Sequence, residues 1–292
     1  MFKVSKSYQT PIIVNDDNNS NKLLDSDKFF VTYANPRYFD ILYYLLKGLN
    51  IYSKIPVIVY IVNNKNNLLL NKFKEFKNII FRYILSDDHI WATKFTIMID
   101  SVNFIKKENT KFIFLDADTI VNYSIDELFI YSDKIKNIPY LSLHPDYLSA
   151  VNSLYDVIGK NKKIEFNKKF GHSNVIWYNS NCINFFKECY YLIIRHRGLG
   201  DEPIINYLQN KNNLTENIPY MTPNFSIYKK YINKENFNDD IGLRKTGELK
   251  ELYLHLFHGC KDINICKLIY NELEEFNLKN PNYKIHYSFN NL

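Results

Sequence analysis

Two aspartates stand directly after a short apolar run. Residues 112–115 read Phe-Ile-Phe-Leu, and Asp116 and Asp118 follow with only Ala117 between them. The apolar run predicts a buried strand, and side chains two apart share one face of an extended chain. Two carboxylates so close repel each other unless a cation lies between them, and Mg²⁺ or Mn²⁺ prefers such ligands and also binds diphosphates. The pair indicates a metal site or, in the plainest alternative, a turn cap at Asp118 and a lysine partner for Asp116.

A second kind of enzyme also carries this motif. Haloacid-dehalogenase-like phosphatases place Asp-x-Asp after an apolar strand and use the first Asp as nucleophile and the second as general acid. In that family the motif usually lies on the first strand, whereas several predicted elements precede it here. Gly200-Asp-Glu202 imitates the family's later acidic motif, so the phosphatase alternative stays open at this point.

The hydrophobic pattern predicts the elements that must position these carboxylates. From residue 28 onward, apolar runs of strand length alternate with helical patterns, which predicts an α/β fold with a mostly parallel sheet and helices on both faces. The expected strand and helix pairs are 29–33 with 38–49, 56–62 with 68–76 and 79–85 with 93–105, and the strand 112–115 follows. Ligands of such sheets bind beyond the carboxyl ends of the strands, where Asp116 and Asp118 are expected to lie.

After Asp118 the pattern changes to an α+β arrangement. It predicts a short helix at 125–132, strands at 140–143 and 174–178, helices at 181–194 and 202–208, and a strand at 252–257. We expect residues 1–27 to form a polar, extended lead-in. Residues 28–292 are expected to form one domain, with a nucleotide-binding half at 28–121 and an acceptor-side half at 122–292 that ends in a helix. The Lys- and Asn-rich segments 159–169 and 228–240 are candidates for mobile flaps.

The composition limits the function classes. The 292 residues are 46% hydrophobic, which is ample for a packed core, and the formal charge of +6 comes from scattered lysines, so no basic block favours nucleic acid. The four cysteines form no Cys-x-x-Cys pair, and no signal peptide or apolar run of about 18 residues stands out. We therefore expect a cytoplasmic protein without structural zinc or a transmembrane segment. The excess of Asn, Lys, Ile and Tyr is typical of an AT-rich genome, such as that of a giant virus, a protist or a bacterium.

The segments Leu115-Asp-Ala-Asp-Thr-Ile-Val121 and Ser124-Ile-Asp-Glu-Leu-Phe129 resemble the metal-binding segment and the following short helix of glycosyltransferase family 8, which includes glycogenin. The resemblance implies a Rossmann-like GT-A fold and a metal site with Mn²⁺ or Mg²⁺, in which Asp116, Ala117 and Asp118 bind metal and donor. It also implies transfer of a hexose-type sugar from a UDP-sugar to a hydroxyl of a glycan, protein or small molecule, with retention of configuration. Relatives often form dimers, so a homodimer is expected.

Two upstream segments extend the resemblance. Val31-Thr-Tyr-Ala-Asn-Pro-Arg-Tyr38 is similar to the family's first strand and loop, in which an Asn and a Tyr hold the nucleotide base. This likeness implies a donor-binding role for Asn35 and Tyr38, with Thr32 and Tyr33 beside them. Trp91-Ala-Thr-Lys94-Phe resembles the segment whose lysine contacts the donor, so Lys94 is implied in donor binding and catalysis. Taken alone, Tyr38 would be an ordinary aromatic residue and Lys94 a solvated lysine.

Downstream, Gly200-Asp-Glu-Pro-Ile-Ile-Asn206 resembles the family's Gly-Asp-Gln-x-x-x-Asn signature. Asp201 is thereby implied as a catalytic residue at the reacting sugar, and Glu202 takes the place of the usual Gln among the donor-binding residues. In isolation, Asp201 would more readily be a helix N-cap, with Pro203 in the first turn.

A further segment departs from the family pattern. Gly171-His-Ser-Asn-Val175 stands where the family tends to have Asn-Ser-Gly-Val. The resemblance implies that Ser173 and Asn174 bind the donor and that His172 and Asn174 reshape the sugar pocket.

His255-Leu-Phe-His-Gly-Cys-Lys261 resembles the family's His-x-x-Gly-x-x-Lys element. The resemblance implies that His255 is the third metal ligand and that Gly259 and Lys261 bind the diphosphate. The glycine is displaced by one residue relative to the family, which leaves His258 as a rival ligand. A non-catalytic relative that binds a nucleotide sugar or a glycan without turning it over is a further alternative.

Overall fold

The computed structural model describes residues 19–63, 71–86, 90–121, 124–143, 171–196, 200–214, 254–256 and 263–279. The chain divides into two compact units. The first unit comprises Met1–Arg37, Lys54–Asp116 and Asp126–Tyr220, and the second comprises Tyr38–Ser53, Ala117–Ile125 and Met221–Leu292. Within the described ranges, no helix combines the length and the apolar character needed to cross a membrane.

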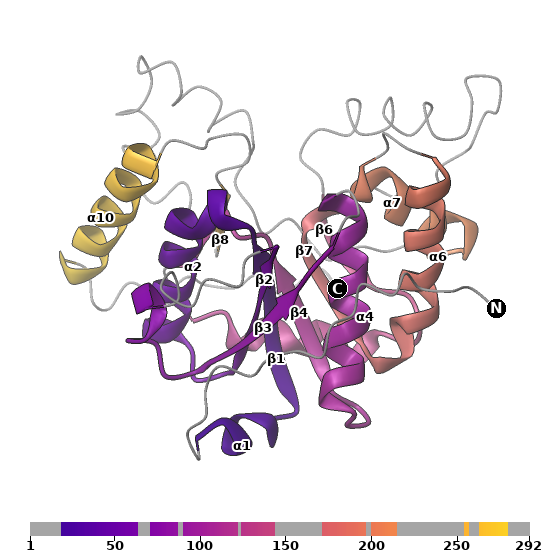
Figure 1. Cartoon of the computed structure of the whole chain (residues 1–292), viewed down its shortest axis with the longest axis horizontal. Coiled ribbons are helices and arrows are strands. Elements are labelled where there is room, and N and C mark those ends of the chain that lie inside the picture. The colour runs from indigo at the N-terminus through magenta and orange to yellow at the C-terminus, as the bar shows by residue number, and fades with distance from the viewer. Residues whose placement is uncertain are drawn as a thin grey trace. The chain divides into compact units, whose positions relative to one another are not determined.

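A six-stranded sheet forms the centre of the first unit (Figure 1). Its strands, in spatial order, are β3 (Ile79–Ile84), β2 (Val57–Val62), β1 (Lys28–Ala34), β4 (Lys111–Leu115), β7 (Gly171–Asn179) and β6 (Tyr140–Leu143). The first four are parallel, whereas β7 runs antiparallel to β4 and β6 antiparallel to β7. The predicted α/β class with a mostly parallel sheet is therefore confirmed.

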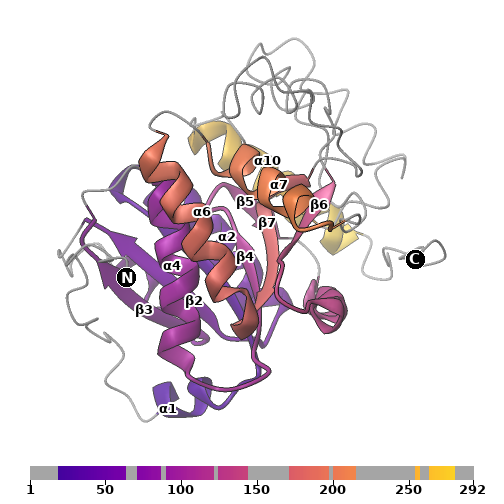
Figure 2. The same ribbon diagram turned by 90° about the vertical axis from the view of Figure 1, so that its right-hand side faces the viewer.

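Both faces of this sheet are covered, which explains why its central strands are apolar along their whole length. On one face, the ring of Phe112 stacks on that of Tyr178, and Tyr178 contacts Phe186 of α6 (Ile183–Arg195). Figure 2 shows α6 beside α4 (Ile90–Ile105) on this face. On the other face lies the 3-10 helix η3 (Asp126–Lys134), whose Leu128 carbonyl accepts a hydrogen bond from the indole N–H of Trp177 at 3.0 Å.

Polar side chains fix α4 across several strands. The carboxylate of Asp100 accepts hydrogen bonds from Arg82 of β3 at 2.9 Å and from the hydroxyl of Tyr60 of β2 at 2.7 Å. Burial raises the pKa of Tyr60, and the neighbouring Asp100 raises it further, so this phenol stays neutral and donates. One residue along the helix, Ser101 shares a 2.8 Å hydrogen bond with the hydroxyl of Tyr178. These contacts hold α4, and with it the position of Lys94, against the sheet.

Buried amides attach α7 (Asp201–Lys211) to the antiparallel strands. The Asn206 side chain accepts from the main-chain N–H of Gly171 and donates to its carbonyl, both at 2.7 Å. The Gln209 side chain donates to the Pro139 carbonyl at 2.6 Å, just before β6. The middle of α7 is therefore fixed to the beginning of β7, and its second half to the residue before β6.

The second unit contains a two-stranded sheet and two helices. Strand β5 (Thr119–Val121) pairs antiparallel with β8 (Leu254–Leu256), and the helices are α2 (Phe39–Tyr52) and α10 (Ile263–Lys279). Gly48 allows α2 to approach β5, because a Cβ there would lie 2.0 Å from the Val121 carbonyl oxygen. Lys47 and Glu274 form an ion pair at 3.3 Å between α2 and α10.

Two local predictions are wrong. Residues 19–24 belong to the expected extended lead-in but form the helix α1 (Asn19–Leu24), and the segment after it is tied down because the Asp27 carbonyl accepts from the N–H of Lys111 at 2.9 Å. Of the helix expected at 68–76, the described part contains only the 3-10 turn η2 (Asn71–Phe73). Phe73 and Phe76 are both buried, and the ring centre of Phe73 lies 5.9 Å from that of Phe81 of β3.

Other expected elements agree with the structure or lie outside it. The remaining expected helices and strands are present with shifted ends, and β5 is an additional strand that the sequence did not predict. Residues 1–18 and the proposed flaps at 159–169 and 228–240 lie outside the described residues. The single-domain organisation of 28–292 stays a prediction.

Candidate active site

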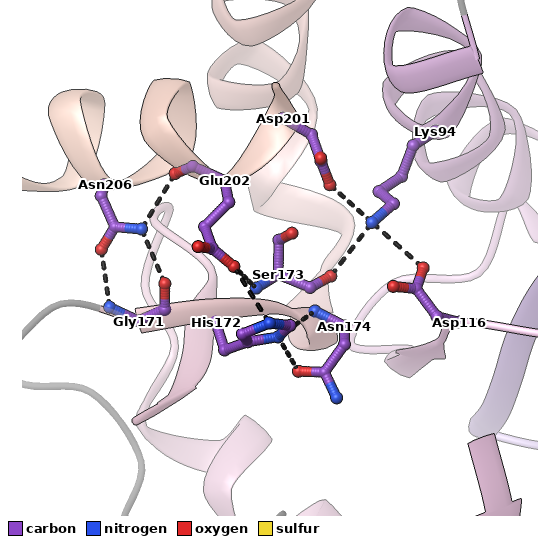
Figure 3. Close-up of polar contacts among 9 residues, drawn as sticks. All are labelled: Lys94, Asp116, Gly171, His172, Ser173, Asn174, Asp201, Glu202 and Asn206. Carbon is purple, nitrogen blue, oxygen red and sulfur yellow. Dashed lines mark hydrogen bonds and ion pairs between the residues drawn. The ribbon is translucent and has the colours of Figure 1, made fainter. Parts of the chain in front are cut away.

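Lys94 joins three segments that are far apart in the chain (Figure 3). It lies near the start of α4, and its side chain is only 4% exposed. Its Nζ lies 3.1 Å from Oδ1 of Asp116, 2.5 Å from Oδ2 of Asp201 and 3.2 Å from the carbonyl oxygen of Ser173. The ammonium group of Lys94 thus forms ion pairs with both carboxylates and donates a hydrogen bond to the Ser173 carbonyl.

The electrostatic surroundings keep Lys94 protonated. Burial lowers its pKa, but the carboxylates of Asp116 and Asp201 outweigh the burial, and the pKa is raised above the ordinary value of lysine. The ammonium also lies over the ring of Phe114, 5.1 Å from its centre. Lys94 is thus a permanent buried cation between two carboxylates. The alternative prediction, that Lys94 is an ordinary solvated lysine, is wrong.

Asp116 is held by the sheet itself. It follows the last residue of β4, and its N–H donates to the Asn174 carbonyl at 2.9 Å, one step beyond the last pair of the β4 and β7 ladder. Its carboxylate therefore lies at the carboxyl end of β4, as the apolar run predicts. The pairing of Asp116 with a lysine, which the plainest alternative foresees, is present.

A bulge in β7 turns main-chain groups toward Lys94. In the pairing with β6, Leu141 is opposite Ile176 but the next residue, Ser142, is opposite His172, so residues 173–175 have no counterpart on β6. The bulged segment supplies the Ser173 carbonyl to Lys94 and the Asn174 carbonyl to Asp116. Bulges commonly change the direction of main-chain groups, and this one turns two carbonyls toward Lys94 and Asp116.

Asp201 opens α7, and its side chain does not cap the helix. The N-cap is Gly200, in an extended conformation, and Asp201 is the first helical residue. A carboxylate in the first turn is stabilised by the helix dipole, and this one is also paired with Lys94. The interpretation of Asp201 as an N-cap is therefore wrong.

Glu202 extends the cluster along the bulge. Its Oε2 accepts a hydrogen bond from the N–H of Ser173 at 3.1 Å and lies 3.4 Å from Nε2 of His172. Nδ1 of His172 lies 3.1 Å from the main-chain nitrogen of Asn174 and also contacts that residue's side-chain oxygen, Oδ1. Ser173, Asn174 and Glu202, all expected to bind the donor, are thus brought together with Lys94, Asp116 and Asp201.

The predicted base-binding residues follow β1. Oδ1 of Asn35 accepts a hydrogen bond from the N–H of Arg37 at 3.0 Å and so shapes the 3-10 turn η1 (Pro36–Tyr38). Tyr33 is half-buried, with its ring centre 5.9 Å from that of Phe114. Thr32 is buried, and its hydroxyl has no hydrogen-bond partner within the described ranges. Tyr38 belongs to the second unit, where it precedes α2 and is half-buried.

The second unit carries two of the predicted metal ligands. Asp118 is half-buried just before β5, and the register of β5 and β8 places His255 opposite Ile120, two residues beyond Asp118. His258, Gly259 and Lys261 lie outside the described residues, as does the side chain of His255. Among the side chains that the structure does describe, no group of three His, Cys, Asp or Glu residues could hold a metal ion. The metal site stays a prediction.

Two asparagines have roles that sequence reasoning missed. Asn206 stands in the 200–206 motif, but only its buried pairing with Gly171 shows what it does. Asn63, after β2, has a φ of 58° and exchanges two 2.8 Å hydrogen bonds with the main chain of Ser86 after β3. Asn is one of the few residues that adopt a positive φ readily, so an asparagine directly after a predicted strand could have indicated this turn.

The sheet order, the antiparallel β7 and the acidic cluster after β4 define a GT-A-like α/β fold of the kind found in glycosyltransferases. Among solved structures, the chain is similar to the galactosyltransferase LgtC in complex with donor and acceptor sugar analogues. The TM-score is 0.52 at 14% sequence identity, and the match covers 85% of this chain and 95% of that one. At this identity the similarity establishes the fold. No family model and no curated protein matches the sequence.

Proposed function

We propose that the chain is a metal-dependent glycosyltransferase that moves a hexose-type sugar from a UDP-sugar to an acceptor hydroxyl, with retention of configuration. The observation that carries this proposal is the cluster in which Lys94 holds both Asp116 and Asp201. The resemblance to family 8 implies donor binding and catalysis for these residues, from three separate motifs. The galactosyltransferase-like fold supports the same conclusion.

The donor atoms of the proposed metal site fit Mn²⁺ or Mg²⁺. Asp116 and Asp118 supply carboxylate oxygens, and the pairing of β5 with β8 supports His255 as the third ligand because it puts the main chain of His255 near Asp118. A bound metal would act as a Lewis acid toward the diphosphate of the donor. His258 remains the rival, and Gly259 and Lys261 are proposed to contact the phosphates.

Lys94 is proposed to position the reacting groups rather than to contact the donor. Its ammonium group pairs with Asp116 and Asp201 and donates to the Ser173 carbonyl. Its ion pair with Asp201 orients that carboxylate beside the sugar, where positive charge develops as the glycosidic bond to phosphate breaks. This role replaces the direct donor contact that the family resemblance implies for the lysine.

The nucleotide is proposed to bind at the residues that follow β1. Asn35 fixes the turn that leads to Tyr38, and the Tyr38 ring is proposed to stack on the uracil. Tyr33 and the main chain around Thr32 are proposed to complete this part of the site, since the Thr32 side chain is buried.

The test measures UDP release and UDP binding in the same preparation. We expect release of UDP from at least one UDP-sugar in the presence of Mn²⁺, and thermal stabilisation by UDP that requires Mn²⁺. Asp118→Asn should abolish the Mn²⁺-dependent stabilisation, whereas the control Asp133→Asn, an exposed aspartate paired with Lys111, should retain it. Hydrolysis of a generic phosphate ester without any nucleotide effect would instead establish a phosphatase. Binding of UDP-sugar without turnover would establish a non-catalytic relative.

A further inference from the structure

Lysines that are scattered along the sequence gather at one edge of the sheet in the first unit. Strands β1 to β4 are parallel, and β6 has the same direction as β4 because both pair antiparallel with β7. The residues that precede these five strands therefore lie at one edge of the sheet, which we call the amino-end edge. The residues after α4 reach the same edge, where α1 also lies (Figure 2). The lysines of these segments are Lys22, Lys28, Lys54, Lys77, Lys106, Lys107, Lys111, Lys134 and Lys136.

Hydrogen bonds join the segments of the amino-end edge to one another. The carbonyl of Asp27 accepts from the N–H of Lys111 at 2.9 Å, and Nζ of Lys107 donates to the carbonyl of Asp25 at 2.7 Å. These contacts connect the segments before β1 and β4 with the end of α4. Two further hydrogen bonds join the segments before β3 and β2, from Asn78 to Ile55 at 3.2 Å, and β7 to the segment before β6, from Asn179 to Ile135 at 2.8 Å. The lysines thus belong to neighbouring segments.

The amino-end edge carries the net positive charge of the described part of the first unit. Seven of its nine lysines are exposed, and Lys28 and Lys111 are half-buried. The same segments contain four carboxylates, those of Asp25, Asp27, Glu108 and Asp133. The other described residues of the unit include eight lysines or arginines and eight carboxylates, so their formal charges balance. The positive charge is therefore a property of this edge and not of the unit as a whole.

The composition of the edge indicates which kind of anion it fits. All nine cations are lysines, whose ammonium groups are hydrated point charges and lack the planar fork with which arginine binds single phosphates and bases. None of the exposed large apolar side chains of the described structure belongs to this edge, so it offers no aromatic surface on which unpaired bases could stack. A row of lysines suits instead a surface of many anionic groups, which attracts it over a Debye length of about 10 Å.

We propose that the amino-end edge binds the surface of a membrane that contains anionic lipids, by electrostatic attraction and without insertion. Each lysine near such a surface strengthens binding by up to about fivefold, and clusters of about four to eight lysines are typical of this mode. The absence of arginine forks and stacking surfaces from the described edge favours lipid headgroups over a nucleic acid. This inference does not rest on the proposed function, because none of these lysines belongs to the candidate active site.

Binding through the amino-end edge leaves the candidate active site accessible. Lys111 begins β4 and Asp116 follows its last residue, so five residues, or roughly 17 Å of extended chain, separate the two edges of the sheet. A first unit held by its amino-end edge keeps the carboxyl ends of its parallel strands away from the membrane. The cluster around Lys94 would then face the solution.

Two triple variants with the same change of charge test this surface. The edge variant combines three exposed lysines from different segments, Lys54→Gln, Lys106→Gln and Lys136→Gln. The control variant combines three exposed cations outside the edge, Arg195→Gln, Lys267→Gln and Lys279→Gln. Arg195 ends α6, which begins beside the edge and extends roughly 20 Å from it. Because all six side chains are exposed, both variants should keep the circular dichroism spectrum of the wild type.

Co-sedimentation with vesicles measures the binding of each full-length protein. The vesicles consist of phosphatidylcholine alone or of phosphatidylcholine with about one third phosphatidylserine. At about 0.1 M salt, we expect the wild type to bind the anionic vesicles at least about tenfold more tightly than the neutral ones, and to be released at about 1 M salt. The edge variant should bind the anionic vesicles at least about tenfold more weakly than the wild type, and the control variant less than about threefold more weakly.

Three results would overturn the inference. The first is a wild type that does not bind anionic vesicles, and the second is an equal loss of binding in the edge and control variants, which would indicate an effect of net charge alone. The third is displacement of the wild type from the vesicles by duplex DNA or single-stranded RNA at an equal concentration of phosphate, which would assign the edge to nucleic acid. UDP release should be the same in the edge variant and the wild type. A failure of the proposed function is therefore recognised separately, by the absence of UDP release from a wild type that binds vesicles.

Discussion

Replacing Lys94 by methionine tests whether the buried cation holds the site together. Methionine has a similar length and no charge, so the change removes the ammonium group from between Asp116 and Asp201 while leaving little empty volume. The matched control is Lys211→Met. The Nζ of Lys211 lies 2.8 Å from Oε1 of Glu188, within the 2.5–3.1 Å range of the Lys94 pairs, but the two side chains are 55% and 42% exposed. The two variants therefore differ mainly in burial.

The expected magnitudes follow from that burial. Removing one partner of a buried ion pair costs about 3–5 kcal/mol, because the other charge is left uncompensated. The Asp201 side chain is 9% exposed and takes this penalty nearly in full, whereas that of Asp116 is 23% exposed and is partly hydrated. We expect Lys94→Met to lower the free energy of unfolding of the first unit by about 3 kcal/mol. Lys211→Met should lower it by less than about 1 kcal/mol, as is usual for exposed pairs.

Urea denaturation followed by tryptophan fluorescence provides the measurement. The protein has two tryptophans, Trp91 and Trp177, and both belong to the first unit, so the signal reports on that unit. The denaturation midpoint should fall strongly in Lys94→Met with little change in the slope of the transition. Equal losses in the two variants, or a loss below about 1 kcal/mol for Lys94→Met, would refute the argument that burial makes the Lys94 contacts strong.

The remaining predictions use the same or similar measurements. The pKa of Lys94 is raised in the folded protein, so its stabilising contribution is complete below the ordinary lysine value of 10.5 and is lost only as the pH rises through the higher folded value. The difference in the free energy of unfolding between wild type and Lys94→Met should therefore be constant from about pH 7 to 9. A steady decline of this difference over that range would contradict the prediction. Gly48→Ala should lower the free energy of unfolding, followed by circular dichroism, by about 2 kcal/mol or more, because the alanine Cβ would meet the Val121 carbonyl. This loss outweighs the better helix propensity of alanine. The control Ile51→Ala, at an exposed site of the same helix, should lower it far less. Asn206→Ala should cost about 2 kcal/mol or more in urea, because it removes the partner of both main-chain polar groups of Gly171.

The sequence predicted most of the fold because the pattern is regular where the sheet is buried. The run Val57–Val62 has all six residues buried, and such a run in alternation with helical patterns permits few arrangements other than a parallel sheet. The predictions failed where local contacts override the pattern. Strand β5 has three residues and exists by pairing with β8, from a segment more than a hundred residues later, which no local pattern reveals.

The sequence predicted which residues belong to the candidate site but not which of them contact one another. Asp116 and Asp201 were identified from separate motifs, yet nothing in either motif indicates that both carboxylates contact Lys94. The bulge at residues 173–175 was also unpredictable, because it depends on the register between β6 and β7 rather than on any one segment. Contacts of this kind arise from tertiary packing, and only the structure shows that the main chain of Ser173 and Asn174 forms part of the cluster.

The ion pair between Lys94 and Asp116 does not exclude a metal site at Asp116, although the sequence analysis treated a lysine partner and a metal site as alternatives. A lysine that merely neutralised a surface aspartate would be exposed and would have one partner, as Lys211 has Glu188 in the described structure. Lys94 is instead buried and also pairs with Asp201, so its charge is divided between two carboxylates and leaves the cluster negative. A divalent cation would reduce that remaining charge. Because Lys94 is itself positive and close to Asp116, its removal should raise the affinity of the remaining carboxylates for Mn²⁺ while it lowers stability.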